Sequence, residues 1–208
     1  MDPVIREVMP VDKMNLGATI PAYPMPVSLV GALVEGKPNF LAVAWFSMVS
    51  FKPPRMAISL GKIHYTNPGI KANASFSLCL PSEDMVEATD YCGIVSGQKA
   101  DKSRVFDLFY GELQTAPMIT DCPLCLECRL VETVDSGLNE IFIGDIVGTY
   151  TDERFLTEGR LDFKKMKPVL LSQPDMSYWG LGAPVAKAWS IGKKYKEKLN
   201  QDPGFSPE

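Results

Sequence analysis

The sequence has little that would place the protein in a membrane or on a nucleic acid. Its longest nearly apolar run, FLAVAWFSMVSF at 40–51, is too short to cross a bilayer and is better read as a buried strand that runs into a turn. The net charge is −4 and no cluster of lysine or arginine interrupts the middle of the chain. Nucleic-acid partners favour a basic face, so neither a membrane nor a nucleic acid is expected as a partner.

Cysteines are few, and nothing at the N-terminus suggests export. The opening residues MDPVIREVMPVDK lack a charged region followed by an apolar core, so no secretory signal peptide is predicted. Five cysteines is an odd number, and without an export signal free thiols in a reducing compartment are the expectation. The protein is therefore predicted to be cytoplasmic.

Three of the cysteines stand at a spacing of three in CPLCLEC, at Cys122, Cys125 and Cys128, which raises the question of a zinc ion or an iron–sulfur cluster. Side chains alternate along a strand, so Cys125 and Cys128 are expected on opposite faces, and no glycine between them allows a knuckle turn. The fourth cysteine of a ferredoxin run and the second C-x-x-C pair of a zinc ribbon are both missing. We predict no metal. Cys128 is a small core residue, and Cys122 and Cys125 lie near a strand edge.

The remaining pattern indicates one mainly β domain over residues 1–195, followed by a polar tail at 196–208. There is no internal repeat. Strand-length apolar runs occur at 26–35, 40–46, 55–61, 75–81, 123–134 and 139–150, with GKPN and DSGL as turns. Helices are predicted at 66–73 and 184–195 and after the N-caps Ser82 and Asp101. Many short strands with few helices are typical of a barrel or sandwich with helical insertions.

The stretch 39–66 holds the residues best suited to bind a ligand. One strand ends at Trp45-Phe46, the connection SMVSFKPP follows, and a second strand ends in GKIHYT. If the two strands are neighbours, the side chains near one another are Ser47, Ser50, Lys62, His64 and Thr66. Hydroxyls, an amine and an imidazole together suit a phosphate.

Two aromatic residues beside this group, Trp45 and Phe46, supply surface for a flat ring. Each residue taken alone also has a plainer interpretation. Trp45 would serve as a core residue, His64 as a structural histidine, since it is the single one in the chain, and Lys62 as a solvated side chain. Only their combination at the ends of two adjacent strands favours a binding site.

The segment from 39 to 102 resembles the flavin reductase-like, FMN-binding split-barrel proteins, in the branch that includes flavoredoxin. The segments YPMPVSLVGALVEGKPN, PLCLECRL, GLNEIFIGDIV and YWGLG are similar to that family as well, and the resemblance covers about residues 15 to 195. It implies a six-stranded Greek-key-like split barrel, commonly a homodimer, with one FMN per subunit near the dimer interface.

The resemblance also implies which residues bind the flavin. The isoalloxazine would be lined by Asn39, Ala44, Trp45, Phe46 and Ser47, and the ribityl phosphate would be held by Ser50, Lys62, His64 and Thr66. In the loop SGQKADK, Lys102 is the first choice for a lysine that reaches the flavin and Lys99 the second. Asn139 stands where some relatives carry a histidine, so a proton-delivery role does not carry over. Tyr178 and Trp179 match an aromatic segment that covers the flavin.

Three functions remain open on the sequence. The leading one is an FMN-binding oxidoreductase that passes electrons from NAD(P)H or a reduced protein to free flavin, iron or another carrier. The alternative is a non-enzymatic FMN electron-transfer protein that serves only protein partners, and the third is a structural barrel that has lost its flavin. FMN itself carries the redox chemistry, so no catalytic side chain is expected. No Rossmann fingerprint is needed, and nothing obvious binds the adenine of FAD.

Overall fold

A seven-stranded antiparallel sheet forms the centre of the protein, in the order β3-β2-β6-β9-β10-β5-β4. The computed structural model describes residues 13–20, 23–173 and 175–200. The strands of this sheet are β2 Ser28–Val34, β3 Lys37–Val43, β4 Phe46–Phe51, β5 Pro54–Gly61, β6 Ser75–Leu80, β9 Leu124–Ser136 and β10 Asn139–Tyr150. The mainly β prediction is confirmed, with one strand more in this sheet than the six expected.

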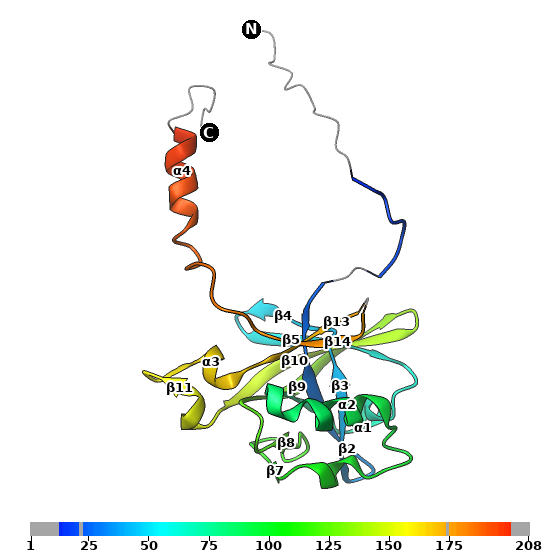
Figure 1. Ribbon diagram of the computed structural model, residues 1–208. Helices are drawn as coiled ribbons and strands as arrows, with labels where there is room; N and C mark the ends of the chain where they lie inside the picture. Colours follow the sequence, from blue (N-terminus) through cyan, green and yellow to red (C-terminus); the bar gives the residue numbers. More distant parts are fainter. Residues whose placement is uncertain (1–12, 21–22, 174, 201–208) are drawn as a thin grey trace.

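Smaller elements surround the sheet (Figure 1). The remaining strands are β1 Met25–Pro26, β7 Leu108–Phe109, β8 Met118–Ile119, β11 Leu156–Thr157, β12 Arg160–Leu161, β13 Val169–Ser172 and β14 Ser177–Gly180, and the helices are α1 Thr66–Asn73, α2 Val86–Ile94, α3 Phe163–Met166 and α4 Gly192–Asn200. Three 3-10 turns occur at Glu83–Met85, Lys102–Val105 and Glu153–Phe155. No helix among the described residues is long and apolar enough to span a bilayer.

The sheet curls around one apolar core. On β5 every second residue is buried, as alternation in a half-buried strand requires. Met56 and Ile58 from β5 meet Leu41 and Val43 from the distant edge strand β3 in a single cluster with Phe142. Strands from the two sides of the sheet can share one cluster only if the sheet bends back on itself, which is the physical basis of the barrel.

A second apolar cluster lies on the other side of the sheet, beneath α2. It contains Leu29, Phe40, Cys79, Cys92, Met118, Ile119, Cys122 and Cys125. Helix α2 packs against β3, while α1 packs against β2. Both helices therefore cover the barrel at the β2–β3 hairpin, at the end of the molecule that also carries β7 and β8 (Figure 1).

Several sequence predictions need correction. The segment SMVSFKPP is not simply a connection, because most of it forms the strand β4 paired with β5. The side chains of 47–49 are all exposed, so this stretch lacks the buried–exposed alternation by which a strand is predicted from sequence. The helix predicted at 184–195 begins only at Gly192. Asp101 caps a turn as expected, by accepting a hydrogen bond from Ser103 N, whereas Ser82 makes no side-chain cap bond.

Gly31 on β2 gives the first testable prediction. A Cβ at this position would lie 2.4 Å from the carbonyl oxygen of Pro117 and 2.5 Å from Ser77 Oγ, closer than such atoms approach without a backbone shift. Overpacking of this kind costs about 1–3 kcal/mol or more. We expect Gly31→Ala to lower the free energy of unfolding in urea by that amount. Gly182→Ala, whose Cβ would meet nothing within 4 Å, should leave it unchanged.

Candidate functional site

A polar cavity of about 260 Å³ opens where β3, α1 and α2 meet. We call it the inner cavity. Asn39 enters it from β3, His64 and Thr66 from the segment that starts α1, and Lys102 from the loop after α2. Asn39 Nδ2 donates a hydrogen bond to Thr66 Oγ1 at 2.8 Å, which ties the strand to the first turn of the helix. Four of the predicted site residues are therefore brought together.

Lys102 is the most unusual residue of this cavity. Its side chain is only 2% exposed, and Nζ donates one hydrogen bond, to the backbone oxygen of Cys92 at 3.1 Å. A lysine ammonium has three N–H donors, and no carboxylate in the described part of the chain forms an ion pair with this one. Burial lowers the pKa of Lys102 because desolvation penalises its charge. Two of its three donors therefore have no hydrogen-bond partner in the described part of the chain.

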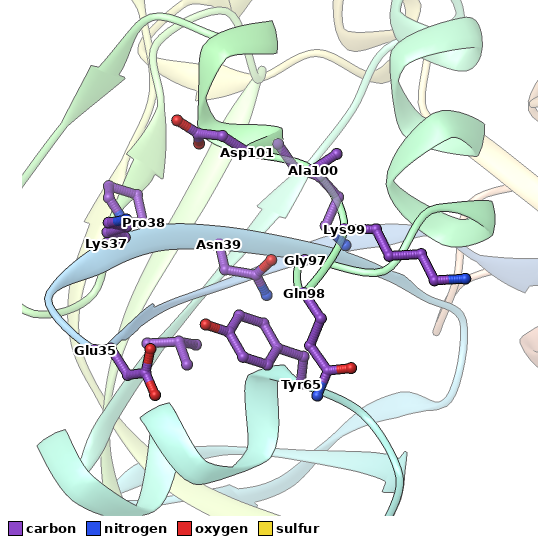
Figure 2. Close-up of a pocket in the computed structure, with 12 residues that line it drawn as sticks. Glu35, Lys37, Pro38, Asn39, Tyr65, Gly97, Gln98, Lys99, Ala100 and Asp101 are labelled. Carbon is purple, nitrogen blue, oxygen red and sulfur yellow. The ribbon is translucent and has the colours of Figure 1, made fainter.

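A larger cavity of about 420 Å³ adjoins the inner one and shares Asn39, Tyr65, Gly97 and Lys102 with it. Figure 2 shows this outer cavity, with Asn39 and Tyr65 facing its middle and Lys99 extending away from both. A Cβ on Gly97 would lie 2.1 Å from Asn39 Oδ1. Glycine therefore allows the loop after α2 to close directly over Asn39.

His64 is half-buried and lies against Gly61, since a Cβ on that glycine would sit 3.4 Å from His64 Nε2 and 4.0 Å from Asn139 Oδ1. Burial, followed by the charge of Lys102, lowers the pKa of His64 from 6.5. The imidazole is thus neutral at pH 7. It can serve as a hydrogen-bond donor to an anion and gains a proton more readily once an anion is present.

The lowered pKa of His64 predicts a pH effect on stability. The unfolded chain binds a proton at His64 below pH 6.5, while the folded chain does so only at lower pH, so stability falls as the pH drops through 6.5. We expect the free energy of unfolding of the ligand-free protein to decrease more between pH 7.5 and 5.5 in the native chain than in His64→Gln. Equal decreases in the two proteins, measured by urea unfolding, would contradict this.

An apolar cleft of about 360 Å³ lies on the outer face of β4 and β5 and contains four of the predicted residues, Ala44, Trp45, Phe46 and Ser47. Ser59 also lines it. Asn139 Nδ2 donates to Ser59 Oγ at 3.0 Å, and Asn139 also lies beside Gly61 and His64. Ser59 and Asn139 therefore connect the apolar cleft to Gly61, against which His64 lies.

Two predicted phosphate contacts do not join this group. β4 and β5 are neighbours, as expected, but they run antiparallel, so Ser50 lies opposite Arg55 near their turn. Lys62 follows the far end of β5, seven residues or about 23 Å further along an extended strand. Its Nζ pairs with Asp135 Oδ2 at 2.6 Å on the β9–β10 hairpin. The expected proximity of Ser50 and Lys62 is wrong.

The remaining predicted residues lie outside both the inner cavity and the apolar cleft. Lys99 lines only the outer cavity and is exposed. Tyr178 donates its hydroxyl to Asp90 Oδ1 at 2.9 Å, and burial together with this carboxylate raises the pKa of Tyr178 to about 12. Trp179 Nε1 donates to Ser172 Oγ at 2.8 Å. Both aromatic side chains are therefore hydrogen-bonded within the chain.

The cysteines follow the expected alternation. Cys125 belongs to the cluster beneath α2 and Cys128 to the barrel core, so their predicted opposite faces are confirmed. The predicted strand edge is wrong for Cys125, because β9 is an interior strand and Cys125 lies opposite Cys79 of β6. All five cysteines are free. Among the described residues, no group of three or more histidine, cysteine or acidic side chains is placed to hold a metal.

Sequence reasoning missed Ser59, Tyr65 and Gly97. Ser59 could have been found from the alternation along 55–61, which places it on the outer face with Ala57. Tyr65 lies between the predicted residues His64 and Thr66. Gly97 in SGQKADK allows the loop to approach Asn39 closely. Only the fold shows that Tyr65 and Gly97 line the same cavities as Asn39 and Lys102, while Ser59 lines the apolar cleft.

The fold is a split barrel that carries a polar inner cavity and an apolar cleft, and the comparisons with known proteins agree with this fold. The flavin reductase like domain matches residues 20–171, so the chain belongs to this family and the predicted resemblance and fold are confirmed. The protein is similar to flavoredoxin from Methanosarcina acetivorans, at 48% identity over 89% of this chain and 100% of that one, with a TM-score of 0.86.

Two further relatives extend this picture. Flavoredoxin of Desulfovibrio vulgaris (Miyazaki F) is 35% identical over 86% of this chain and 99% of its own, with a TM-score of 0.80. An uncharacterized protein of Archaeoglobus fulgidus is 31% identical over 127 residues, which are 60% of this chain and 71% of that protein. The likeness to the two flavoredoxins thus extends well past the family domain.

Proposed function

We propose that the protein binds FMN and acts as an oxidoreductase that takes electrons from NAD(P)H or a reduced protein. The observation that carries this proposal is the buried ammonium of Lys102, which has no anionic partner in the described chain and opens on the inner cavity. The similarity to flavoredoxins along nearly the whole chain supports a flavin as the ligand.

The residues present fit the phosphate end of FMN in the inner cavity. Lys102 supplies charged donors and His64 a neutral imidazole beside them. Thr66 uses its oxygen to accept from Asn39, which leaves its own hydroxyl proton for a ligand, and the first turn of α1 adds a favourable dipole. Hydrogen bonds to charged groups are each worth about 1.5–3 kcal/mol, so these contacts suffice for firm binding.

The ring would occupy the apolar cleft, where Trp45 and Phe46 offer aromatic surface and Ser47 a hydroxyl. When bound, FMN supplies the redox chemistry itself. The chain's own residues bind and orient it. Ser59 and Asn139, already joined by a hydrogen bond, hold the path between cleft and cavity. Asn139 carries no titratable proton, so proton delivery at this position is not part of the proposal.

A second candidate function is electron transfer between proteins only, without NAD(P)H oxidation. The flavoredoxin similarity at 48% identity favours it. Rapid mixing of the FMN-loaded protein with NADH or NADPH in the absence of oxygen separates the two. Loss of the flavin's visible absorbance within seconds supports the oxidoreductase. Absorbance that persists with both nucleotides, but is lost with a chemical reductant, supports the electron-transfer protein.

We further propose that two copies associate. Strand β4 is an edge of the main sheet and exposes Met48, Val49 and Phe51, the last at 93%. An exposed apolar edge of this kind is a ready interface or an aggregation hazard. The five free cysteines support a reducing compartment, for which we propose the cytoplasm.

A further inference from the structure

The segment that follows β14 leaves the barrel and carries apolar side chains into solvent. Figure 1 shows 181–200, orange to red, rising away from the sheets and ending in α4. We call it the C-terminal arm. Val185 is 100% exposed and Trp189 97% exposed, while Leu181, Ile191 and Tyr195 are at least half exposed. Tryptophan is highly buried on average in folded proteins. In the described part of this chain, nothing packs over the apolar side chains of the arm.

The charge of the arm indicates what covers it. Segment 181–200 contains five lysines, at 187, 193, 194, 196 and 198, and one acid, Glu197. Its net charge is therefore +4, whereas residues 13–180 carry −4, with 15 lysines and arginines against 19 aspartates and glutamates. An arm with this charge is attracted to the body of the same protein. Residues 181–191, if extended, reach on the order of 35 Å, enough to cross to a second copy.

A hollow that could accept a side chain of the arm lies beside the apolar cleft. A hollow of about 460 Å³ adjoins the cleft and shares Tyr23 and Trp45 with it, both of which are well exposed. Met25 also lines the hollow, so an indole ring would meet apolar and aromatic surface there.

We propose that the C-terminal arm of one copy docks on the second copy, with Trp189 in the hollow between Tyr23 and Trp45. Each copy carries both the arm and the hollow, so a twofold pair satisfies both at once. The arm then closes the partner's cleft and excludes water from it. This inference rests on the proposed association of two copies, whereas the docking itself does not require FMN.

The test uses the full chain with Ala188→Cys labelled by an environment-sensitive fluorophore. Labelling is selective because the five native cysteines are at most 3% exposed. Glu158→Cys, at the exposed β11–β12 turn, is the labelled control. We expect the emission of the arm label to shift to shorter wavelength as concentration rises, in step with a light-scattering mass of twice 22.9 kDa. The control label should not shift.

A mixing experiment shows which copy receives the arm. Labelled chains are diluted into an excess of unlabelled Trp189→Ala chains, which keep the hollow but compete poorly for it, and the arm label should still shift. Trp189→Ala alone should raise the dimer dissociation constant about thirtyfold, as for a central interface tryptophan. Leu138→Ala, which removes a side chain 88% exposed on the body, should not.

Three outcomes would overturn the inference. If the protein forms a pair while the arm label stays solvent-exposed, the pair forms without the arm. A label shifted even at the dilution of single chains would place the arm on its own barrel. A single-chain mass at every concentration would remove both the pair and the docking. Visible flavin content, measured on the same samples, tests the proposed function separately.

Discussion

Lys102→Met is expected to weaken FMN binding about a hundredfold without unfolding the protein. The loss follows from one or two charged hydrogen bonds to phosphate at about 1.5–3 kcal/mol each, and 1.4 kcal/mol is a factor of ten in affinity. Methionine fills similar space and suits the buried position, where the lysine side chain is 2% exposed. Quenching of flavin fluorescence by the ligand-free protein measures the affinity.

Lys62→Met is the matched control, because Lys62 is exposed and already paired with Asp135. Its effect on FMN affinity should stay within about threefold, since exposed ion pairs contribute about 0–1 kcal/mol. His64→Ala should fall between the two. If Lys62→Met cost as much as Lys102→Met, the phosphate would contact Lys62, as the family resemblance implied, and the inner cavity would be the wrong site.

The second large effect is expected at Glu127, a fully buried carboxylate on β9. It accepts hydrogen bonds from the backbone nitrogens of Glu112 at 3.0 Å and Leu113 at 2.8 Å, and from Tyr150 OH at 3.0 Å. Glu127→Ala would leave three part-buried donors without their shared acceptor. We expect it to lower the free energy of unfolding by about 3–5 kcal/mol, measured by urea unfolding.

Two further variants separate the contributions of the individual hydrogen bonds to Glu127. Tyr150→Phe removes one donor and keeps the carboxylate with its two backbone partners, so a loss of about 1 kcal/mol is expected. Glu127→Gln keeps one acceptor oxygen and should fall between the alanine variant and the native chain. A loss below 1 kcal/mol for Glu127→Ala would show that the loop at 110–115 does not depend on the carboxylate.

Much of the fold could be predicted because local patterns and fold agree. The long hairpin of 123–134 and 139–150 was visible as two apolar runs around DSGL, and it forms β9 and β10. Helix α1 occupies 66–73, the predicted range. Alternation along β9 predicts that Cys125 and Cys128 lie on opposite faces, and they lie in different apolar clusters.

The incorrect predictions concern features that depend on strand pairing and on which side chains are exposed, neither of which a local pattern gives. Strand β4 lies inside a nearly continuous apolar run, and three of its exposed side chains, Met48, Val49 and Phe51, are hydrophobic, so the sequence shows no apolar–polar alternation there. Ser50 and Lys62 were grouped on proximity in sequence, whereas antiparallel pairing with β5 sends them to opposite ends of the hairpin. A lysine's partner cannot be read from spacing either: Asp135 lies 73 residues from Lys62.

The measurement that tests the account most directly is the flavin content of the purified protein. The visible spectrum is recorded, the chromophore is released by acid and identified, and the ligand-free chain is then titrated with FMN. The account predicts a two-banded yellow spectrum, FMN in the released fraction and one FMN bound per chain on titration. A colourless protein that fails to bind added FMN would contradict it, as would a broad brown spectrum that bleaches with reductant.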